Sequence, residues 1–284
     1  MRKKHMKLLL LFISIIMMLT GCGDAQVSNS NAQNQNIMRV HYIDVGQGDS
    51  ILIQVNNKNL LIDAGPNDST DNLISYLKKQ NISKLDYVVA THPHEDHIGG
   101  MAAVIKKFQI GEFYAPKIIS STKTFESMTN ALKSKNLKIN SAREGVTIDL
   151  GKNTKCVMLA PNSENYDNIN NYSAVIKITY GNSRFLFDGD AEKLSENEII
   201  NKNLDLSSDI LKVGHHGSTS SSSPAFLDKV SPKVAIISCG KGNNYGHPHK
   251  ATLTALNKRK IQIYRTDIDG TIVFESDGNK ILKK

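Results

Sequence analysis

Short apolar runs bounded by Gly, Asn, Asp and Ser recur along most of the chain, and each is about long enough to cross a sheet once. Runs of this length and composition predict β-strands. The predicted strands cover residues 39–44, 50–55, 58–62, 87–91, 155–159, 174–180, 183–187, 210–213, 234–238, 262–265 and 271–275.

Helical spacing of apolar residues separates several of these strands. The predicted helices cover residues 70–80, 99–108, 122–135, 191–202, 224–230 and 250–258. Strands joined by tight turns are followed by helices and then by further strands. This order predicts an α/β fold in which helices cover two sheets.

The first residues depart from this pattern. Basic residues precede an apolar stretch at 8–19, which is shorter than the roughly 18 residues of a spanning helix and typical of a signal peptide. Leu19-Thr20-Gly21-Cys22 resembles a bacterial lipobox. It predicts a lipoprotein signal peptide at 1–21 and a lipid on Cys22, which would anchor the protein at the extracellular face of the cell membrane. A plain secretory peptide cleaved elsewhere is the alternative.

Residues 22–36 are rich in Ser, Asn, Gln and Ala without an apolar period, and they predict a flexible tether. Residues 37–284 are enough for one large α/β domain. The whole chain has 35 Lys and Arg against 27 Asp and Glu, and without the four basic residues of the predicted leader 31 against 27 leaves +4. This mild excess is compatible with an anionic substrate but does not indicate obligate nucleic-acid binding.

Two cysteines, Cys156 and Cys239, lie in apolar strand-like segments. The sequence is compatible with a disulfide between them in an oxidising compartment or with two buried free thiols. Buried thiols are the favoured interpretation, because free cysteine behaves as a small apolar residue.

The run from His92 to His97 reads His-x-His-x-Asp-His. Residues 85–91 before it read as a buried strand, and the residues after it as a helix, so the run lies on a strand-to-helix loop. Neutral imidazole and carboxylate suit a borderline divalent metal such as Zn²⁺ or Mn²⁺. A hydrogen-bonded core histidine would explain one of these residues, but not the whole run.

Two halves of the chain follow a similar order. A strand that ends at Asp63 is followed, one helix and one strand later, by His92. The segment 185–190 is followed, again one helix and one strand later, by His215 and His216. Two similar halves would bring both groups of histidines to one seam.

These residues resemble the metallo-β-lactamase superfamily, whose signature His-x-His-x-Asp-His stands intact here. The resemblance implies an αββα sandwich of two mixed sheets flanked by helices, with a dinuclear metal site at the sheet edges. Over about residues 38–276 the chain is similar to the C-terminal hydrolase domain of ComEC/Rec2-type DNA-uptake proteins, without their polytopic channel region. Four segments carry this closer resemblance: 43–50, 171–175, 211–218 and 245–249.

The resemblance also implies a ligand set for two divalent ions, Zn or Mn. His92 and His94 match the ligands of the first ion, and Asp96 and His97 match those of the second. Asp190 matches the carboxylate that bridges the two ions. Two ions held in this way would activate a metal-bound hydroxide for attack on the substrate.

Some assignments leave alternatives. Asp188 is the alternative to Asp190 as the bridge. His216 is expected to be the last ligand of the second ion, and His215 is its rival, because adjacent residues at a strand end point opposite ways. His215 and Asp96 are also candidate catalytic residues.

Many members of the superfamily bring a third histidine to the first ion, and none stands between His97 and Asp190. Asn171 and Ser173 occupy that stretch instead. The first ion is therefore expected to have an open position for water or substrate, as a catalytic site requires. The missing ligand also disfavours a true β-lactamase.

The remaining candidates lie around this centre. His247 and His249 are expected to protonate a leaving group or to bind a phosphate. Asp44 and Asp63 either orient the ligating imidazoles or stabilise turns. The expected substrate-binding residues are Asn171, Ser173, Lys241, Asn243 and Tyr245.

The serine-rich run at 218–223 is expected to be a flexible loop with Ser223 as the N-cap of the following helix. No Gly-x-Ser-x-Gly surrounds it, so a serine nucleophile is not indicated.

The function expected from the resemblance is a surface-anchored, metal-dependent phosphodiesterase, with a nuclease acting on extracellular DNA as the preferred case. One alternative is a hydrolase of another ester or a lactam, such as a phosphocholine-type esterase. Another is a non-catalytic module that binds DNA or wall polymer at the membrane. An anionic phosphodiester and the membrane are the expected partners, and no protein partner is inferred.

Overall fold

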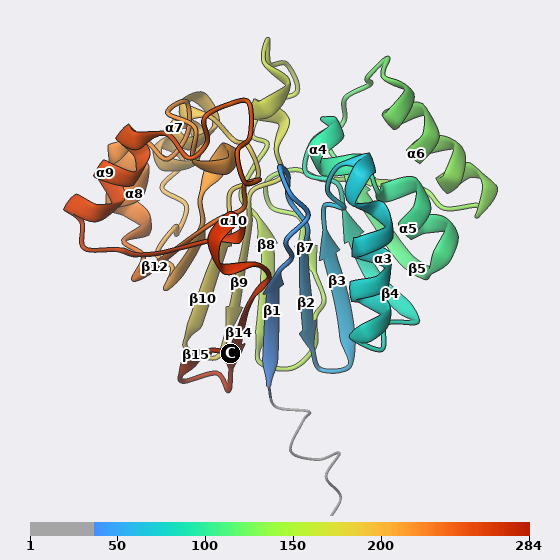
Figure 1. The fold of residues 1–284 in the computed structure, drawn as a ribbon, viewed down its shortest axis with the longest axis horizontal. Helices are drawn as coiled ribbons and strands as arrows, with labels where there is room; N and C mark the ends of the chain where they lie inside the picture. The colour runs from blue at the N-terminus through green and yellow to red at the C-terminus, as the bar shows by residue number, and fades with distance from the viewer. Residues whose placement is uncertain (1–36) are drawn as a thin grey trace, which may run out of the picture. The chain divides into compact units, whose positions relative to one another are not determined.

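Two β-sheets lie face to face, and helices cover the outer face of each, in the computed structural model of residues 37–284 (Figure 1). The predicted signal peptide at 1–21, the lipidation of Cys22 and the tether at 22–36 lie outside the described residues.

The first sheet has antiparallel strands on one side and parallel strands on the other. Strand β1 pairs antiparallel with β14 and β2, whereas β3 to β6 run parallel to one another. Within residues 37–284, its eight strands stand in the order β15 (Ile281–Lys283), β14 (Ile272–Ser276), β1 (Met38–Tyr42), β2 (Ile51–Val55), β3 (Lys58–Ile62), β4 (Lys84–Val89), β5 (Gln109–Ala115) and β6 (Ile139–Ser141).

The second sheet repeats this mixture. Strands β10 to β13 run parallel, and β7 to β10 run antiparallel. Its seven strands in the described part of the chain stand in the order β13 (Gln262–Arg265), β12 (Val234–Ile237), β11 (Ile210–Lys212), β10 (Ser183–Phe187), β9 (Ile176–Tyr180), β8 (Thr154–Met158) and β7 (Thr147–Ile148).

The helices form two groups, one on each outer face (Figure 1). The first sheet is covered by α3 (Thr70–Lys79), α4 (Glu95–Ile98), α5 (Met101–Lys107) and α6 (Lys123–Ser134). The second sheet is covered by α7 (Lys193–Asn201), α8 (Pro224–Val230) and α9 (Lys250–Lys258). Shorter helical turns are η2 (Asn67–Ser69), η3 (Ile169–Tyr172), η4 (Gly214–Gly217) and α10 (Thr266–Asp269).

Strand alternation explains why the sandwich has three apolar layers. In β2, Ile51 and Ile53 face the core between the sheets, whereas Leu52 faces the helices. In β10, Phe187 faces the core between the sheets, and Leu186 packs under α7 and α8. Both sheets are thus buried on both faces, which confirms the predicted αββα sandwich with two mixed sheets.

Every predicted strand and helix overlaps an observed element, but β5, β6, β7 and β15 were not predicted. The first half of β5 is mostly exposed and contains Gly111, so it shows no clear strand pattern of its own. Its pairing with β4 supplies the regularity. The helix predicted at 99–108 begins only at Met101, after the separate turn α4.

The predicted repeat is present in the topology. An antiparallel hairpin of β2 and β3 is followed by β4, which runs parallel to β3. An antiparallel hairpin of β9 and β10 is followed by β11, which runs parallel to β10. In each half, an aspartate follows the hairpin and histidines follow the next parallel strand, so both histidine loops emerge at the same edge of the sandwich.

Candidate metal centre

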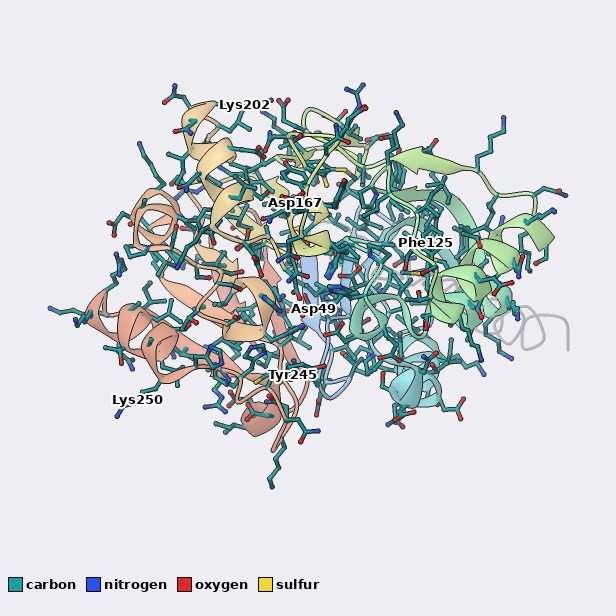
Figure 2. The ribbon with its side chains drawn as sticks, turned by 90° about the horizontal axis from the view of Figure 1, so that it is seen from above. Asp49, Phe125, Asp167, Lys202, Tyr245 and Lys250 are labelled. Atoms are coloured by element: carbon teal, nitrogen blue, oxygen red, sulfur yellow. The ribbon has the colours of Figure 1, made fainter. Side chains whose placement is uncertain are left out.

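Loops from both halves form the site at this edge of the sandwich. The run from His92 to His97 follows β4 and includes α4, Asp190 follows β10, and His216 lies in η4 after β11. Figure 2, which views the molecule from above, places Asp49 and Tyr245 between the two halves, with Phe125 on one side and Lys250 on the other.

One carboxylate oxygen of Asp190 is the meeting point of the histidines. The side chain is almost fully buried, at 1% exposure. The Nε2 atoms of four histidines surround its Oδ2 atom: His97 at 3.3 Å, His216 at 3.5 Å, His215 at 3.7 Å and His92 at 3.9 Å. Asp190 therefore stands where a bridging carboxylate must stand.

A complete ligand set for one ion lies on one side of Asp190. Asp96, His97, Asp190 and His216 each bring one donor atom to within 4.8 Å of the others. On the other side, Nε2 of His92 lies 3.0 Å from Nδ1 of His94. The two sides thus bring together the residues that the resemblance implies for the two ions.

The donor atoms are left free for a cation. Within the described residues, His97 Nε2, His216 Nε2 and Asp190 Oδ1 are buried without a hydrogen-bond partner. Leaving such atoms unsatisfied costs about 1–3 kcal/mol each. A divalent ion would satisfy all of them, so the residues fit the metal that the signature implies.

Groups behind the imidazoles fix their orientation. Asp63 Oδ2 lies 2.7 Å from Nδ1 of His97, and the main-chain oxygen of Ser238 lies 2.9 Å from Nδ1 of His216. Ser173 Oγ lies 3.3 Å from Nδ1 of His92. Contacts of this kind keep the proton on Nδ1 and direct the Nε2 lone pair to the metal. Asp63 thus orients a histidine side chain, which is the first of the two roles considered for it.

Asp44 has the other role. Its Oδ1 accepts the N–H of Gly46 at 3.1 Å, which stabilises a turn in the loop between β1 and β2.

Asp188 is fully buried, and neither carboxylate oxygen has a hydrogen-bond partner in the described chain. Its Oδ2 lies so close to Gly214 that a Cβ added there would be only 2.5 Å away. The histidines surround the carboxylate of Asp190 and not that of Asp188.

The buried histidines and aspartates of the centre shift one another's pKa. Burial opposes protonation of His97, but Asp190 and Asp63 outweigh it and hold the pKa of this imidazole well above its ordinary value. Burial would raise the pKa of Asp190, but His216 and His97 hold it well below the usual range. Protons and divalent ions therefore compete for the same atoms, and metal binding should weaken as the pH falls.

The expectation that His215 and His216 point opposite ways was wrong. Both residues have left-handed backbone angles, with φ of 49° and 53°, so the alternation of an extended strand does not apply. Both side chains turn toward Asp190. His216 belongs to the group whose donor atoms lie within 4.8 Å of one another, whereas His215 stays outside that group and its Nδ1 lies 2.9 Å from Ser220 Oγ.

The substrate-binding roles expected of Asn171 and Ser173 need correction. Asn171 is 4% exposed, and its Oδ1 accepts the N–H groups of Glu192 and Ser195 at 3.3 and 3.4 Å. Ser173 is fully buried, and its Oγ accepts the N–H of Asp190 at 3.0 Å. Both side chains are committed to holding the loops that carry the ligands.

Asn243 and His249 also have structural roles. Asn243 donates to the main-chain oxygens of Gly240 and His247 at 2.9 and 2.6 Å, and it accepts the N–H of His247. His249 Nδ1 accepts the N–H of Thr219 at 3.1 Å, and its Nε2 lies 3.2 Å from the main-chain oxygen of Tyr245. These contacts shape the loop and leave neither side chain free for substrate.

His247 and Tyr245 do face the cleft. With Gln47, His94, Asp96 and His215 they line a cavity of about 300 Å³ over the ligands. Burial, together with the nearby His216 and His215, lowers the pKa of His247 to about 4. The imidazole is therefore neutral at pH 7.

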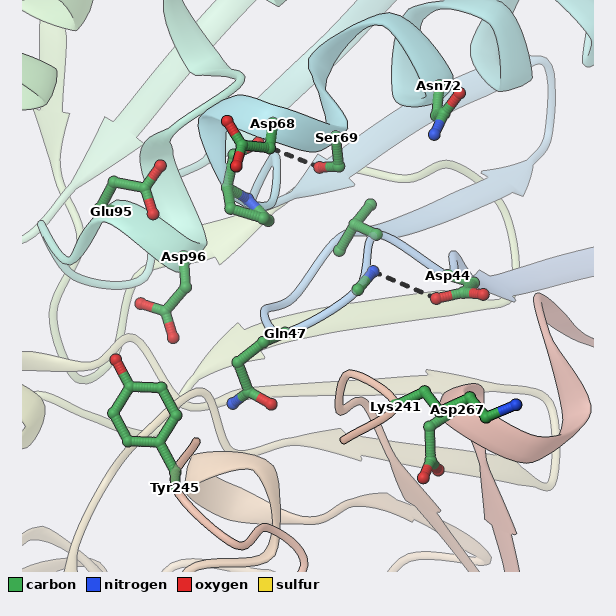
Figure 3. A pocket seen from close by; sticks show the side chains of 13 residues that line it. Asp44, Gln47, Asp68, Ser69, Asn72, Glu95, Asp96, Lys241, Tyr245 and Asp267 are labelled. Atoms are coloured by element: carbon green, nitrogen blue, oxygen red, sulfur yellow. Dashed lines mark hydrogen bonds between the residues drawn. The ribbon is translucent and has the colours of Figure 1, made fainter. Parts of the chain in front are cut away.

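A wider cavity of about 690 Å³ adjoins the first (Figure 3). Gln47, Glu95, Asp96 and Tyr245 line both cavities, so the two are continuous. The wide cavity is acidic, and among the residues of 37–284 that line it Lys241 is the only basic one. Its carboxylates are those of Asp44, Asp68, Glu95, Asp96 and Asp267.

The serine-rich run is an ordered part of the fold. Ser221, Ser222 and Ser223 are buried, and the carboxylate of Glu196 accepts the N–H groups of the last two. The expectation of a flexible loop overlooked this distant partner. Ser223 caps α8 as predicted, because its Oγ accepts the N–H of Phe226 at 3.3 Å.

Cys156 and Cys239 are buried free thiols, which was the favoured interpretation of the sequence.

Lys212 was not predicted from the sequence as a residue of the site, although a lysine in the apolar segment 210–213 is unusual for a buried strand. It is 0% exposed and forms an ion pair with Asp49.

Among residues 37–284, no helix combines the length and the apolar character that a bilayer crossing requires.

Comparisons with known proteins show the family to which the chain belongs. Residues 43–241 match the family model of the metallo-beta-lactamase superfamily. ComE operon protein 3 of Bacillus subtilis is 32% identical over 253 residues, which cover 83% of this chain and 32% of that protein. Competence protein ComA of Neisseria gonorrhoeae is 30% identical over 242 residues, which cover 84% and 32%. The chain thus spans about a third of the length of these relatives.

Among solved structures, the metallo-beta-lactamase fold protein YhfI of Bacillus subtilis superposes with a TM-score of 0.58 at 13% identity. The match covers 84% of this chain and 100% of that one, and it shows the shared fold. The buried His/Asp cluster fits a divalent metal and a metal-dependent hydrolase. With its signature, fold and family match in agreement, the chain belongs to the metallo-β-lactamase superfamily.

Proposed function

We propose that this chain is a metal-dependent phosphodiesterase, with DNA as the preferred substrate. The observation that carries this proposal is the position of Asp190, whose Oδ2 lies within 3.9 Å of the Nε2 atoms of four histidines from two loops. A carboxylate shared by two ligand sets is the arrangement that supports two-metal hydrolysis.

The two ions, when bound, would activate water and offset charge on the phosphoryl oxygens. The protein's own residues bind and orient the substrate. His215 points its Nε2 toward the centre, and Ser220 Oγ contacts its Nδ1. The Nε2 atom of His215 can therefore carry a proton in the centre. Neutral His247 lines the same cavity and can hydrogen-bond a leaving-group oxygen.

Tyr245 supports a nucleic-acid substrate. Its ring is 66% exposed and borders both cavities, so it offers a face on which a base can stack. The relative from Neisseria gonorrhoeae is named a competence protein, and the resemblance to DNA-uptake proteins points to the same substrate. A role in the cell envelope, with the protein anchored outside the membrane by Cys22, belongs to the same proposal.

The acidic wide cavity favours a second candidate. Asp44, Asp68 and Glu95 face it together with Lys241, whereas Asp267 is paired with Arg265. Negative charge still exceeds positive charge, so a polyanion gains little by entering the cavity. A phosphodiester or ester with a cationic group, such as a phosphocholine-type substrate, would place its phosphate at the metal centre and its cation in this cavity. A DNA strand bound at the metal centre would have to extend away from this acidic cavity.

The purified full-length chain, supplied with Mn²⁺ or Zn²⁺, distinguishes these functions. We expect cleavage of bis-p-nitrophenyl phosphate and plasmid DNA, and loss of both activities in Asp190→Asn. Turnover of p-nitrophenyl phosphorylcholine without DNA cleavage would favour the second candidate. Turnover of nitrocefin alone would contradict the phosphodiesterase, and DNA binding without any turnover would indicate a non-catalytic module.

A further inference from the structure

We propose that Lys212 is a positioning residue for the metal centre, which holds the peptide before Asp190 and thereby sets how the bridging carboxylate meets the two ions. This inference rests on the proposed metal-dependent function. It concerns metal binding itself, so the two can fail separately.

The ammonium group of Lys212 lies beneath the centre, out of contact with solvent. The side chain is 0% exposed and lines neither cavity. Its Nζ donates to the main-chain oxygen of Gly189 at 3.0 Å, pairs with the carboxylate of Asp49 and lies 3.9 Å from Oδ1 of Asp190. A substrate cannot reach this group, so Lys212 acts through its neighbours.

These contacts join the two halves of the sandwich. Asp49 lies in the loop between β1 and β2 of the first sheet, whereas Lys212 ends β11 of the second sheet and Gly189 lies in the loop after β10. Asp49 in turn lies 3.5 Å from Nδ1 of His216 and 4.0 Å from Nδ1 of His97. One ammonium group therefore supports ligands that come from both sheets.

The peptide that carries Asp190 is held at both ends. Lys212 Nζ and the N–H of His215, each at 3.0 Å, donate to the oxygen of Gly189, and Ser173 Oγ accepts the N–H of Asp190 at 3.0 Å. Gly189 has φ of +54°, a conformation that glycine adopts without strain. The Oδ1 atom of Asp190 accepts no hydrogen bond from the described residues, so the contacts of its peptide set the direction of the carboxylate.

Lys212 also offsets buried negative charge. Asp49, Asp63 and His97 place donor atoms within 4.8 Å of one another behind the centre. A buried carboxylate that loses its cation is strongly destabilising. Neutralising Asp49 and positioning Asp190 are therefore two separable roles, and a double variant separates them.

The test uses the full chain with Lys212→Met, Asp49→Asn and the double variant. Lys212→Met leaves Asp49 unpaired and should lower the Tm, whereas the double variant removes both charges and should recover most of it. We expect the double variant to bind Mn²⁺ about tenfold or more weakly by calorimetry. Its electron paramagnetic resonance spectrum should show isolated Mn²⁺ where the wild type shows an exchange-coupled pair.

Wild-type affinity and a coupled spectrum in the double variant would overturn the inference, because Lys212 would then serve only as a counter-charge. If the methionine variants do not fold, Asp49→Asn alone decides, since it keeps the bond from Lys212 to Gly189. It should keep the coupled spectrum, and loss of coupling would overturn the inference. A wild type that binds no Mn²⁺ would instead refute the proposed function.

Discussion

The Nδ1 atom of His97 lies 2.7 Å from Oδ2 of Asp63, and both side chains are fully buried. Asp63 also accepts the N–H and the hydroxyl of Thr91 at 2.8 and 2.7 Å, so its carboxylate cannot turn away. Asp63 lies one helix and one strand before the run from His92 to His97. It thus fixes which nitrogen of His97 faces Asp190.

Asp63→Asn should weaken metal binding by about 10- to 100-fold, because an amide can present its NH₂ to Nδ1 and favour the wrong tautomer. Titration calorimetry with Zn²⁺ measures the affinity. Asp44→Asn is the matched control, since Asp44 holds a turn, and it should bind metal as the wild type does. Equal losses in both variants would contradict the assigned roles.

The two histidines that flank Pro248 should differ in their effect on turnover. His247→Asn should lower kcat on bis-p-nitrophenyl phosphate by about 10²-fold, because His247 lines the cavity over the ligands. His249→Asn should change kcat by only a few fold, because both ring nitrogens of His249 contact the main chain. A larger loss in His249→Asn than in His247→Asn would reverse the assignment.

Acid should destabilise the fold through His41, which is 2% exposed in β1 with Nδ1 2.8 Å from the hydroxyl of Tyr76. Burial lowers the pKa of His41 from 6.5 to about 4. The folded state then binds fewer protons than the unfolded state between these values. The stabilising contribution is complete above pH 6.5 and is lost as the pH falls toward 4, by about 3 kcal/mol.

Urea unfolding of the wild type and of His41→Gln, in the presence of a chelator, measures this contribution. The free energy of unfolding of the wild type should fall more steeply between pH 6.5 and 4.5 than that of the variant. Parallel curves for the two proteins would show that His41 does not titrate in this range.

Both thiols of the sandwich should be inert in the native protein. Burial raises the pKa of Cys156 and of Cys239 to about 12, so little thiolate forms at pH 8. In a full-length chain with Cys22→Ser, a disulfide reagent should react with both thiols in urea and with neither in buffer. Rapid labelling without urea would contradict the burial of these residues.

The sequence predicted the parts of the site that are local in the chain. His92 to His97 stand together, and the apolar runs around them define a strand and a helix, so their position followed from the pattern. Asp190 and His216 lie far from this run, and the family resemblance, with the repeated order of the two halves, was needed to join them to it.

The rest depends on contacts that no local pattern encodes. Lys212 meets Asp49 across the two sheets, and Glu196 holds the serine-rich run at 218–223 from another helix. The direction of the His215 side chain was misjudged because the backbone turns left-handed after the strand. The same limit applies to Asn243, whose amide is used by its own loop.

The metal content of the purified full chain tests the central claim most directly. After saturation with Mn²⁺ and gel filtration, elemental analysis should find about two ions per wild-type chain. Asp190→Asn should retain at most one, with an unchanged circular dichroism spectrum, because its carboxylate stands between the two ligand sets. A wild type without metal, or an Asp190→Asn variant that keeps both ions, would contradict the account.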